Sequence, residues 1–167
     1  MSTLAVFAFD DETGADRMRE ALSRLRAQQL ITLDDAAVVV RSKDGKVKVR
    51  QAQSLVGAGA LGGAFWGMLI GLLFLAPWLG MAVGAVSGAI AGKMTDLGID
   101  DKFIKEVGSS IQPGNSAIFL LVREATVDRV LDEVRHLNPQ LISTSLPEDK
   151  EQELRAALGA EQEKVEA

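Results

Sequence analysis

Two ladders of glycine constrain the fold of this chain more than any other feature. They lie within residues 55–93, a stretch of about forty residues with no formal charge before Lys93, in a chain of which 25% is charged. A spacing of four residues places each ladder on one stripe of an α-helix, where another backbone can approach closely. The ladders are Gly59, Gly63, Gly67 and Gly71, followed by Gly80, Gly84, Gly88 and Gly92.

The two ladders are in register as an antiparallel helical hairpin. A chain reversal between Leu75 and Ala76 brings Gly59 opposite Gly92 and Gly71 opposite Gly80. We therefore expect the two helices to pack on each other through glycine. A further face of small residues on the second helix is left for a neighbouring copy, which predicts self-association without specifying a ring, a shell or a helical assembly. That assembly face contains Ala82, Ala85 and Ala89.

The two arms of the hairpin differ in length and in hydrophobicity. As helices, residues 55–76 would be about 33 Å long and residues 78–92 about 22 Å, against a hydrocarbon core of about 30 Å. The first arm contains ten Leu, Ile, Val and Phe residues and the second four, which favours insertion by about 3 to 6 and about 1 to 2.5 kcal/mol respectively. Whether the hairpin spans the bilayer or only dips into it stays open. The expected membrane anchors are Trp66, Trp78 and Lys93.

Composition excludes several kinds of site. The net charge of −5 argues against nucleic acid as a partner. The chain has no cysteine and a single histidine, so neither a thiolate nucleophile nor a histidine-rich metal site is available. The glycine repeats lack the lysine of a phosphate-binding loop. We therefore expect no enzymatic activity, no metal and no cofactor.

The sequence on either side of the block predicts short strands and amphipathic helices. Apolar and β-branched runs predict strands over residues 4–9, 36–41, 46–50, 117–122 and 141–145, with Asp44-Gly45 as a tight turn. Helices are expected from Gly14, after an Asp100 N-cap, from Thr126 and from Glu148. The inward positions of the third are Val127, Val130, Leu131, Val134 and Leu137.

Three polar features have both a structural and a functional interpretation. The acidic residues 10–12 are favoured as caps of the following helix rather than as a metal or acid–base cluster. The basic face of residues 46–50 fits either anionic headgroups or plain solvation. His136 is favoured as a solvent-side residue near a helix C-terminus.

The charged residues 148–167 are expected to form a helix that docks on a partner.

A weak repeat links the two ends of the chain. Asp16-Arg17-Met18 and Asp128-Arg129-Val130 each follow an apolar strand and precede another. Strand, helix and strand occur twice, which predicts an α+β fold of ferredoxin-like type with both helices on one face and an inserted antiparallel glycine-zipper hairpin. The expected units are two halves of an α+β domain in 1–52 and 97–147, the hairpin in 53–96 and a charged helix or tail in 148–167.

One segment after the ladders completes a recognisable pattern. It contains Gly98-Ile99-Asp100-Asp101 and Pro113-Gly114-Asn115-Ser116-Ala117. With the ladders and the N-terminal strand and helix, it resembles the bacterial family of uncharacterised membrane proteins labelled domain of unknown function twelve-sixty-nine, over nearly the whole chain. The resemblance implies a membrane-associated bacterial protein and supplies no activity, cofactor or catalytic residue.

Three functions fit these features. The first is a non-enzymatic, self-assembling membrane protein that scaffolds or shapes the bilayer, with lipid and itself as partners. It would lie at the bacterial inner membrane with both termini in the cytoplasm, because the chain starts without a basic leader and a hairpin returns to the side it entered. The second is a soluble or peripheral cytoplasmic oligomer whose hairpins form a shared protein core and whose α+β domain binds an unknown ligand or partner. The third is a small pore.

Overall fold

The sheet and its helices account for most of the residues whose positions are defined. A computed structural model describes residues 3–51, 66, 69–71, 73–74 and 99–166. The strands are β1 (Thr3–Phe9), β2 (Ile31–Arg41), β3 (Val47–Gln51), β4 (Ser116–Ala125) and β5 (Gln140–Thr144). The helices are α1 (Gly14–Ala27), α5 (Asp101–Ser110), α6 (Val127–Val134), η1 (Arg135–Leu137, a 3-10 turn) and α7 (Glu148–Glu166). The predicted α+β class is confirmed.

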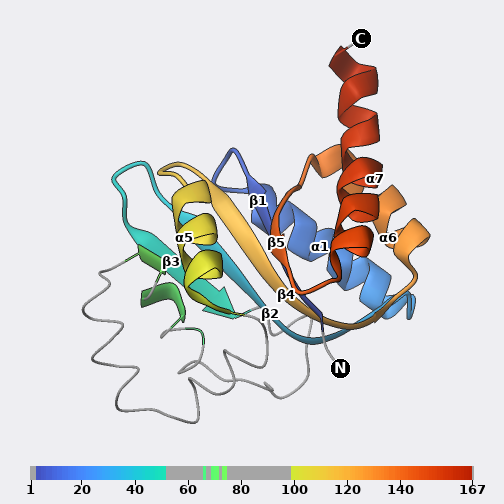
Figure 1. Ribbon diagram of the computed structural model, residues 1–167, viewed down its shortest axis with the longest axis horizontal. Helices are drawn as coiled ribbons and strands as arrows, with labels where there is room; N and C mark the ends of the chain where they lie inside the picture. The colour runs from blue at the N-terminus through green and yellow to red at the C-terminus, as the bar shows by residue number, and fades with distance from the viewer. Residues whose placement is uncertain (1–2, 52–65, 67–68, 72, 75–98, 167) are drawn as a thin grey trace.

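The five strands form one antiparallel sheet in the order β3-β2-β4-β1-β5 (Figure 1). Strand β4 lies in the middle, as its continuous apolar run predicted, because a strand covered on both faces needs apolar side chains on both. It pairs with β1 from Ser116 to Val122 and with β2 over nearly its whole length. The N-terminal strand β1 is therefore paired, near the centre of the sheet, with a strand from the C-terminal half of the chain.

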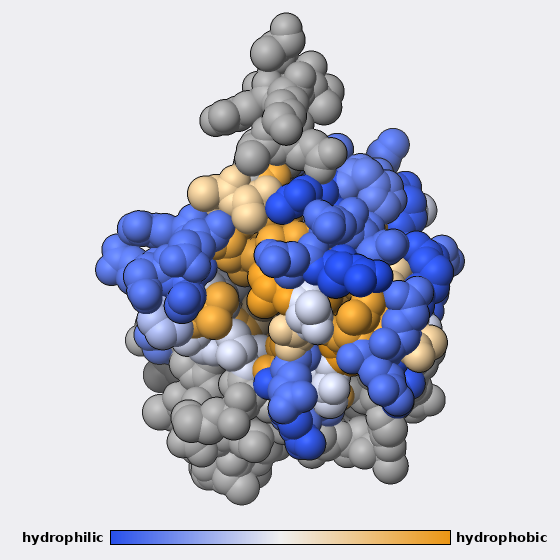
Figure 2. Space-filling model, turned by 90° about the vertical axis from the view of Figure 1, so that its right-hand side faces the viewer, coloured by the Kyte–Doolittle hydropathy of each residue, from blue (hydrophilic) through white to orange (hydrophobic). Residues whose placement is uncertain are grey.

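Three helices cover what we call the first face of the sheet: α1, α6 and α7 (Figure 1). Figure 2, which views the molecule from the side of these helices, shows hydrophilic side chains around hydrophobic ones. The expectation for the C-terminal helix needs correction, because Leu154, Ala157 and Leu158 pack against the core of their own chain. Val127, expected to be inward, is 55% exposed. Residues 123–129 are all exposed, so the first turn of α6 lies beyond the covered part of the sheet.

The second face of the sheet is covered by α5 and by part of the uncharged block. Its apolar side chains alternate along the strands with those of the first face, as the period of two in a strand requires. The buried ones are Leu4, Val6 and Ala8 of β1, Ala37 and Val39 of β2, Ala117, Phe119 and Leu121 of β4, and Ile142 of β5. The sheet therefore has helical residues packed on both of its faces.

Local signals in the sequence account for several turns and caps. Gly45 has φ +89° in the β2–β3 turn, the left-handed conformation that glycine adopts without strain. Asp100 Oδ1 accepts from the Phe103 N–H at 2.8 Å, which confirms the predicted N-cap of α5. The cap interpretation of residues 10–12 holds for Asp11, whose Oδ1 accepts from the N–H groups of Thr13 and Gly14.

Most of the predicted hairpin lies outside the described residues. Of the ladder glycines only Gly71 is described, in helical conformation and partly buried. No helix within the described part of the chain is long and apolar enough to span a membrane.

Candidate functional site on the second face of the sheet

Two register shifts between strands β2 and β4 decide which face of the sheet carries Asp35, the polar residue at the centre of this site. Between β2 and β4 the register shifts at Asp34 on one strand and at Arg123 on the other. Each strand thus carries one extra residue, and the two extra side chains form an ion pair at 2.6 Å. A bulge shifts the phase of a strand by one residue. Leu33 therefore belongs to the first face, while Asp35 shares its side with Ala37 and Val39 of the second.

Asp35 is fully buried and accepts hydrogen bonds from two N–H groups. Its Oδ1 accepts from the Ala36 N–H at 2.8 Å, and its Oδ2 accepts from Trp66 Nε1 at 3.1 Å. Burying a carboxylate is costly unless hydrogen bonds replace those it made with water. The Trp66 ring is only 2% exposed and meets Phe119 edge to face, with ring centroids 6.0 Å apart. The only acidic side chain buried among the described residues thus joins β2 to the uncharged block.

We call Trp66, Leu69, Ile70, Gly71, Leu73 and Phe74 the docked segment. All six are helical, and Leu69 and Ile70 are 0% and 6% exposed against the second face. Burying these two side chains contributes about 3 to 6 kcal/mol as an upper estimate.

Arg41, at the end of β2, ties the far end of the docked segment to α5. Its guanidinium lies 5.5 Å from the centre of the Phe74 ring, a cation–π distance. Its Nη1 donates to the carbonyl of Ile111 at 2.8 Å, just after α5 ends. One side chain therefore contacts the strand layer, the docked segment and the helix beside it.

Gly108 allows α5 and the docked segment to touch through their backbones. A Cβ at this position would lie 2.8 Å from the carbonyl oxygen of Leu73, closer than carbon and oxygen atoms normally approach. Because that oxygen is backbone, a rotamer change cannot relieve the clash. Glycine at position 108 is thus a packing requirement, and its signal in the sequence is a helix-weakening residue inside an amphipathic helix.

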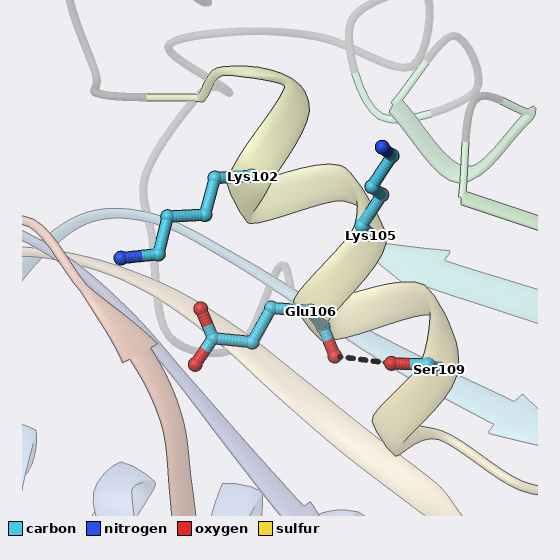
Figure 3. Close-up of a pocket in the computed structure, with 4 residues that line it drawn as sticks. All are labelled: Lys102, Lys105, Glu106 and Ser109. Carbon is cyan, nitrogen blue, oxygen red and sulfur yellow. Dashed lines mark hydrogen bonds between the residues drawn. The ribbon is translucent and has the colours of Figure 1, made fainter.

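The outer side of α5 lines a hollow of about 570 Å³ (Figure 3). The described residues around it are Lys102, Lys105, Glu106 and Ser109. Lys102 and Glu106 extend toward the same side of the helix, and Lys105 extends to another. Neither lysine forms an ion pair with any described residue. The hollow therefore presents two cations beside the helix that packs on the docked segment.

A second cleft, of about 390 Å³, opens where β1 ends and β5 begins. Asp10, Asn138, Gln140 and Arg155 provide its polar groups. Arg155 donates to the carbonyls of Leu141 and Ile142 as well as to Glu151, so its guanidinium mainly joins α7 to β5. The other polar groups that line this cleft are the Asp10 carboxylate and the amides of Asn138 and Gln140. No group of three or more metal-binding side chains comes together in the described ranges.

Charges on the first face are arranged differently. The pKa of Asp11 lies below its ordinary value of 3.8, mainly because Arg17 donates a hydrogen bond to its carboxylate at 2.8 Å. The basic face of β3 lies on this side too, since Arg50 binds Asp16 of α1 at 2.7 Å while Val47 and Val49 pack on the second face. The basic strand face and the docked segment therefore lie on opposite sides of the sheet.

Few of the residues singled out in the sequence are placed by the structure. Trp66 lies in the protein core and Gly71 in the docked segment. The role of Trp66 as a membrane anchor stays a prediction. The residues that fall outside the described part of the chain are Gly59, Gly63, Gly67, Gly80, Gly84, Gly88 and Gly92, with Ala82, Ala85, Ala89, Trp78 and Lys93.

Asp35 and Arg41, which contact the docked segment, were not predicted from the sequence. Asp35 had a detectable signal, because an acidic pair at 34–35 interrupts an otherwise apolar strand. The sequence predicts a strand over residues 36–41, which leaves Asp35 outside it, whereas β2 begins at Ile31. Arg41 had no distinguishing signal, since a basic residue at a strand end is common on a surface.

Comparison with known proteins gives one match. The model of a family described as a protein of unknown function (DUF1269) matches residues 60–159. That range includes the docked segment, α5, β4 and most of the C-terminal half. Neither the curated proteins nor the solved structures contain a significant match.

Proposed function

The chain belongs to the DUF1269 family of proteins of unknown function, and we propose that it is a non-enzymatic, self-assembling, membrane-associated protein with an α+β domain attached to its hairpin. The observation that carries the proposal is the uncharged stretch of residues 55–92, whose docked segment packs on the second face and is joined to it by the Asp35–Trp66 hydrogen bond. An uncharged block that merely tethered the domain would need no such contact. The α+β domain instead sets the position from which the block leaves it.

Charge on α5 supports membrane association. Lys102 and Lys105 lie on the exposed side of the helix whose Gly108 contacts the docked segment. Basic residues near an anionic bilayer surface each contribute about 1 kcal/mol to binding. The two lysines therefore support the proposal that this side of α5 meets lipid headgroups.

We further propose that the α+β domain is a ferredoxin-like duplication with the hairpin inserted between its halves. The units β1-α1-β2 and β4-α6-β5 have the same order of elements, and β1 pairs with β4 at the centre of the sheet. Helices α1 and α6 both pack on the first face. The segment between β3 and α5 then corresponds to the insertion.

Carbonate extraction and a salt wash of native membranes test membrane association. We expect the protein to stay with the membrane in both treatments, and release by either would refute integral insertion. Assembly is tested with Gly67→Leu and Gly84→Leu, which place a bulky side chain on each ladder. Gly62→Leu is the matched control, because it makes the same change in the same block off the ladders. Ladder variants that assemble like the control would contradict the glycine packing.

A second candidate function is a lipid-free oligomer whose α+β domain binds a small ligand. It is favoured by the burial of Trp66, Leu69 and Ile70 in protein and by the polar cleft at Asp10. Purification without detergent as a particle of defined mass and without lipid would support it. Phospholipid retained at a fixed ratio to protein would favour the membrane function instead.

A further inference from the structure

We infer that the second face of the sheet is a reversible dock for the docked segment, and that the protein enters the bilayer by releasing it. This inference rests on the proposed membrane function and concerns how insertion is controlled. The docked state is the one described above. In the released state the same residues complete the first arm of the hairpin.

Length makes the two states mutually exclusive. As a helix, the first arm of residues 55–76 would be about 33 Å long, which is enough to cross a bilayer. With the docked segment on the sheet, the chain before it offers only residues 55–65, which as a helix would be about 17 Å long against a core of about 30 Å. Trp66, Leu69 and Ile70 cannot be buried by β2 and β4 and by lipid at the same time. The sheet and the bilayer thus compete for the same side chains.

The contacts of the docked segment are of a kind that lipid can replace. Leu69 and Ile70 meet apolar side chains, and acyl chains are about as apolar as those partners. The hydrogen bond from Trp66 Nε1 to Asp35 is specific to the dock, because no acyl chain offers a carboxylate. Once Trp66 leaves, water can reach and solvate Asp35. The hydrogen bond therefore favours the docked state without making release prohibitive.

Helix α5 keeps part of the second face covered when the segment leaves. Ile99, Phe103, Val107 and Ile111 belong to the same core as Ile142, and α5 contacts β5, an edge strand of the sheet. Gly108 would then face the space that the Leu73 backbone had filled. The docked state therefore depends on contacts at two separate places, the Asp35–Trp66 hydrogen bond at one end of the docked segment and the close approach of Gly108 to Leu73 at the other.

Tryptophan fluorescence can report the released state directly. The chain has two tryptophans, so Trp78→Phe leaves Trp66 as the only emitter. The probe is a vesicle of phosphatidylethanolamine and phosphatidylglycerol with brominated acyl chains, which quench an indole only from within the bilayer. Iodide in the buffer reports exposure to water, and flotation reports the bound fraction.

Asp35→Ala in the Trp78→Phe chain should favour release, because Trp66 Nε1 then has lost its acceptor in the dock. We expect the ratio of released to docked Trp66, from bromolipid quenching, to rise about tenfold. Asp35→Asn is the matched control, because its single amide oxygen can still accept from Trp66 Nε1 at the loss of the acceptor for the Ala36 N–H, and it should change the ratio less than Asp35→Ala does. Gly108→Ala acts at the opposite end and should raise the ratio too. It carries the test if circular dichroism shows that Asp35→Ala does not fold.

The outcomes separate this inference from the proposed function. Bromolipid quenching that rises in both variants while flotation stays constant supports the dock. Protein that floats and resists carbonate, but whose Trp66 is never quenched in any variant, overturns the dock and leaves the membrane function standing. Protein that neither floats nor resists carbonate overturns both.

Discussion

Gly108→Ala should reverse the usual effect of such a substitution in a helix. Replacing glycine by alanine inside an exposed helix stabilises it by about 0.8 to 1.0 kcal/mol. Here the new Cβ would lie 2.8 Å from the Leu73 carbonyl oxygen, so the docked segment or α5 must shift. Overpacking of this kind costs about 1 to 3 kcal/mol. The sum predicts destabilisation by up to about 2 kcal/mol.

Thermal and urea unfolding followed by circular dichroism measure this effect. A loss of about 2 kcal/mol in a protein of this size lowers Tm by about 4 to 8 °C. Ser109→Ala is the matched control, because Ser109 is an exposed neighbour on the same helix and its replacement should leave Tm unchanged or slightly raised. In a Trp66→Phe background, where docking is weaker, the cost of Gly108→Ala should shrink. A Gly108→Ala variant with a Tm raised like that of any exposed helix would refute the close contact between α5 and Leu73.

Three further perturbations test separate parts of the structure. Asp35→Ala removes the carboxylate that accepts from Trp66 Nε1, and should lower the free energy of unfolding in urea by about 1 to 3 kcal/mol. Asp35→Asn should lower it less, and equal stabilities of the two variants would contradict the hydrogen bond. A double-mutant cycle between Asp34→Ala and Arg123→Ala should give a coupling of about 0.2 to 1 kcal/mol, because the arginine is largely exposed, and the coupling should fall in high salt. The pKa of Asp11 is lowered on folding from 3.8, so its charge stabilises the fold above pH 3.8 and this contribution is lost as pH falls through the folded value. The stability gap between parent and Asp11→Asn should therefore close on acidification, and a gap that widened would show that the pKa is raised instead.

Elements governed by neighbouring residues could be predicted from the sequence. The central strand β4, the turn at Gly45 and the cap at Asp100 each depend on side-chain periodicity or on backbone conformation within a few residues. Predictions failed where burial depended on distant partners. Val127 lies on the correct stripe of its helix but extends beyond the covered part of the sheet. Leu154 and Leu158 suggested a partner because the first-face core they complete is assembled from distant segments.

The candidate site shows the same division. The sequence indicated that the block from residue 55 must avoid water, and that conclusion follows from its lack of charge alone. Hydrophobicity does not distinguish a sheet from a lipid chain as the apolar partner. The bulges at Asp34 and Arg123 could not be predicted from the sequence either. A bulge interrupts the alternation of apolar and polar residues in the same way as the end of a strand does.

The α+β class and the order of most described elements follow from the amino-acid sequence alone, because they depend on periodicities of two and 3.6 residues. The uncharged block likewise follows from composition alone. Only the tertiary structure decided that Trp66 meets a buried carboxylate, that Gly108 admits the Leu73 backbone and that Arg41 joins the two helical covers. Each of these contacts joins residues at least 31 positions apart in the chain. Their geometry depends on how the strands twist and shift against each other, which no local pattern specifies.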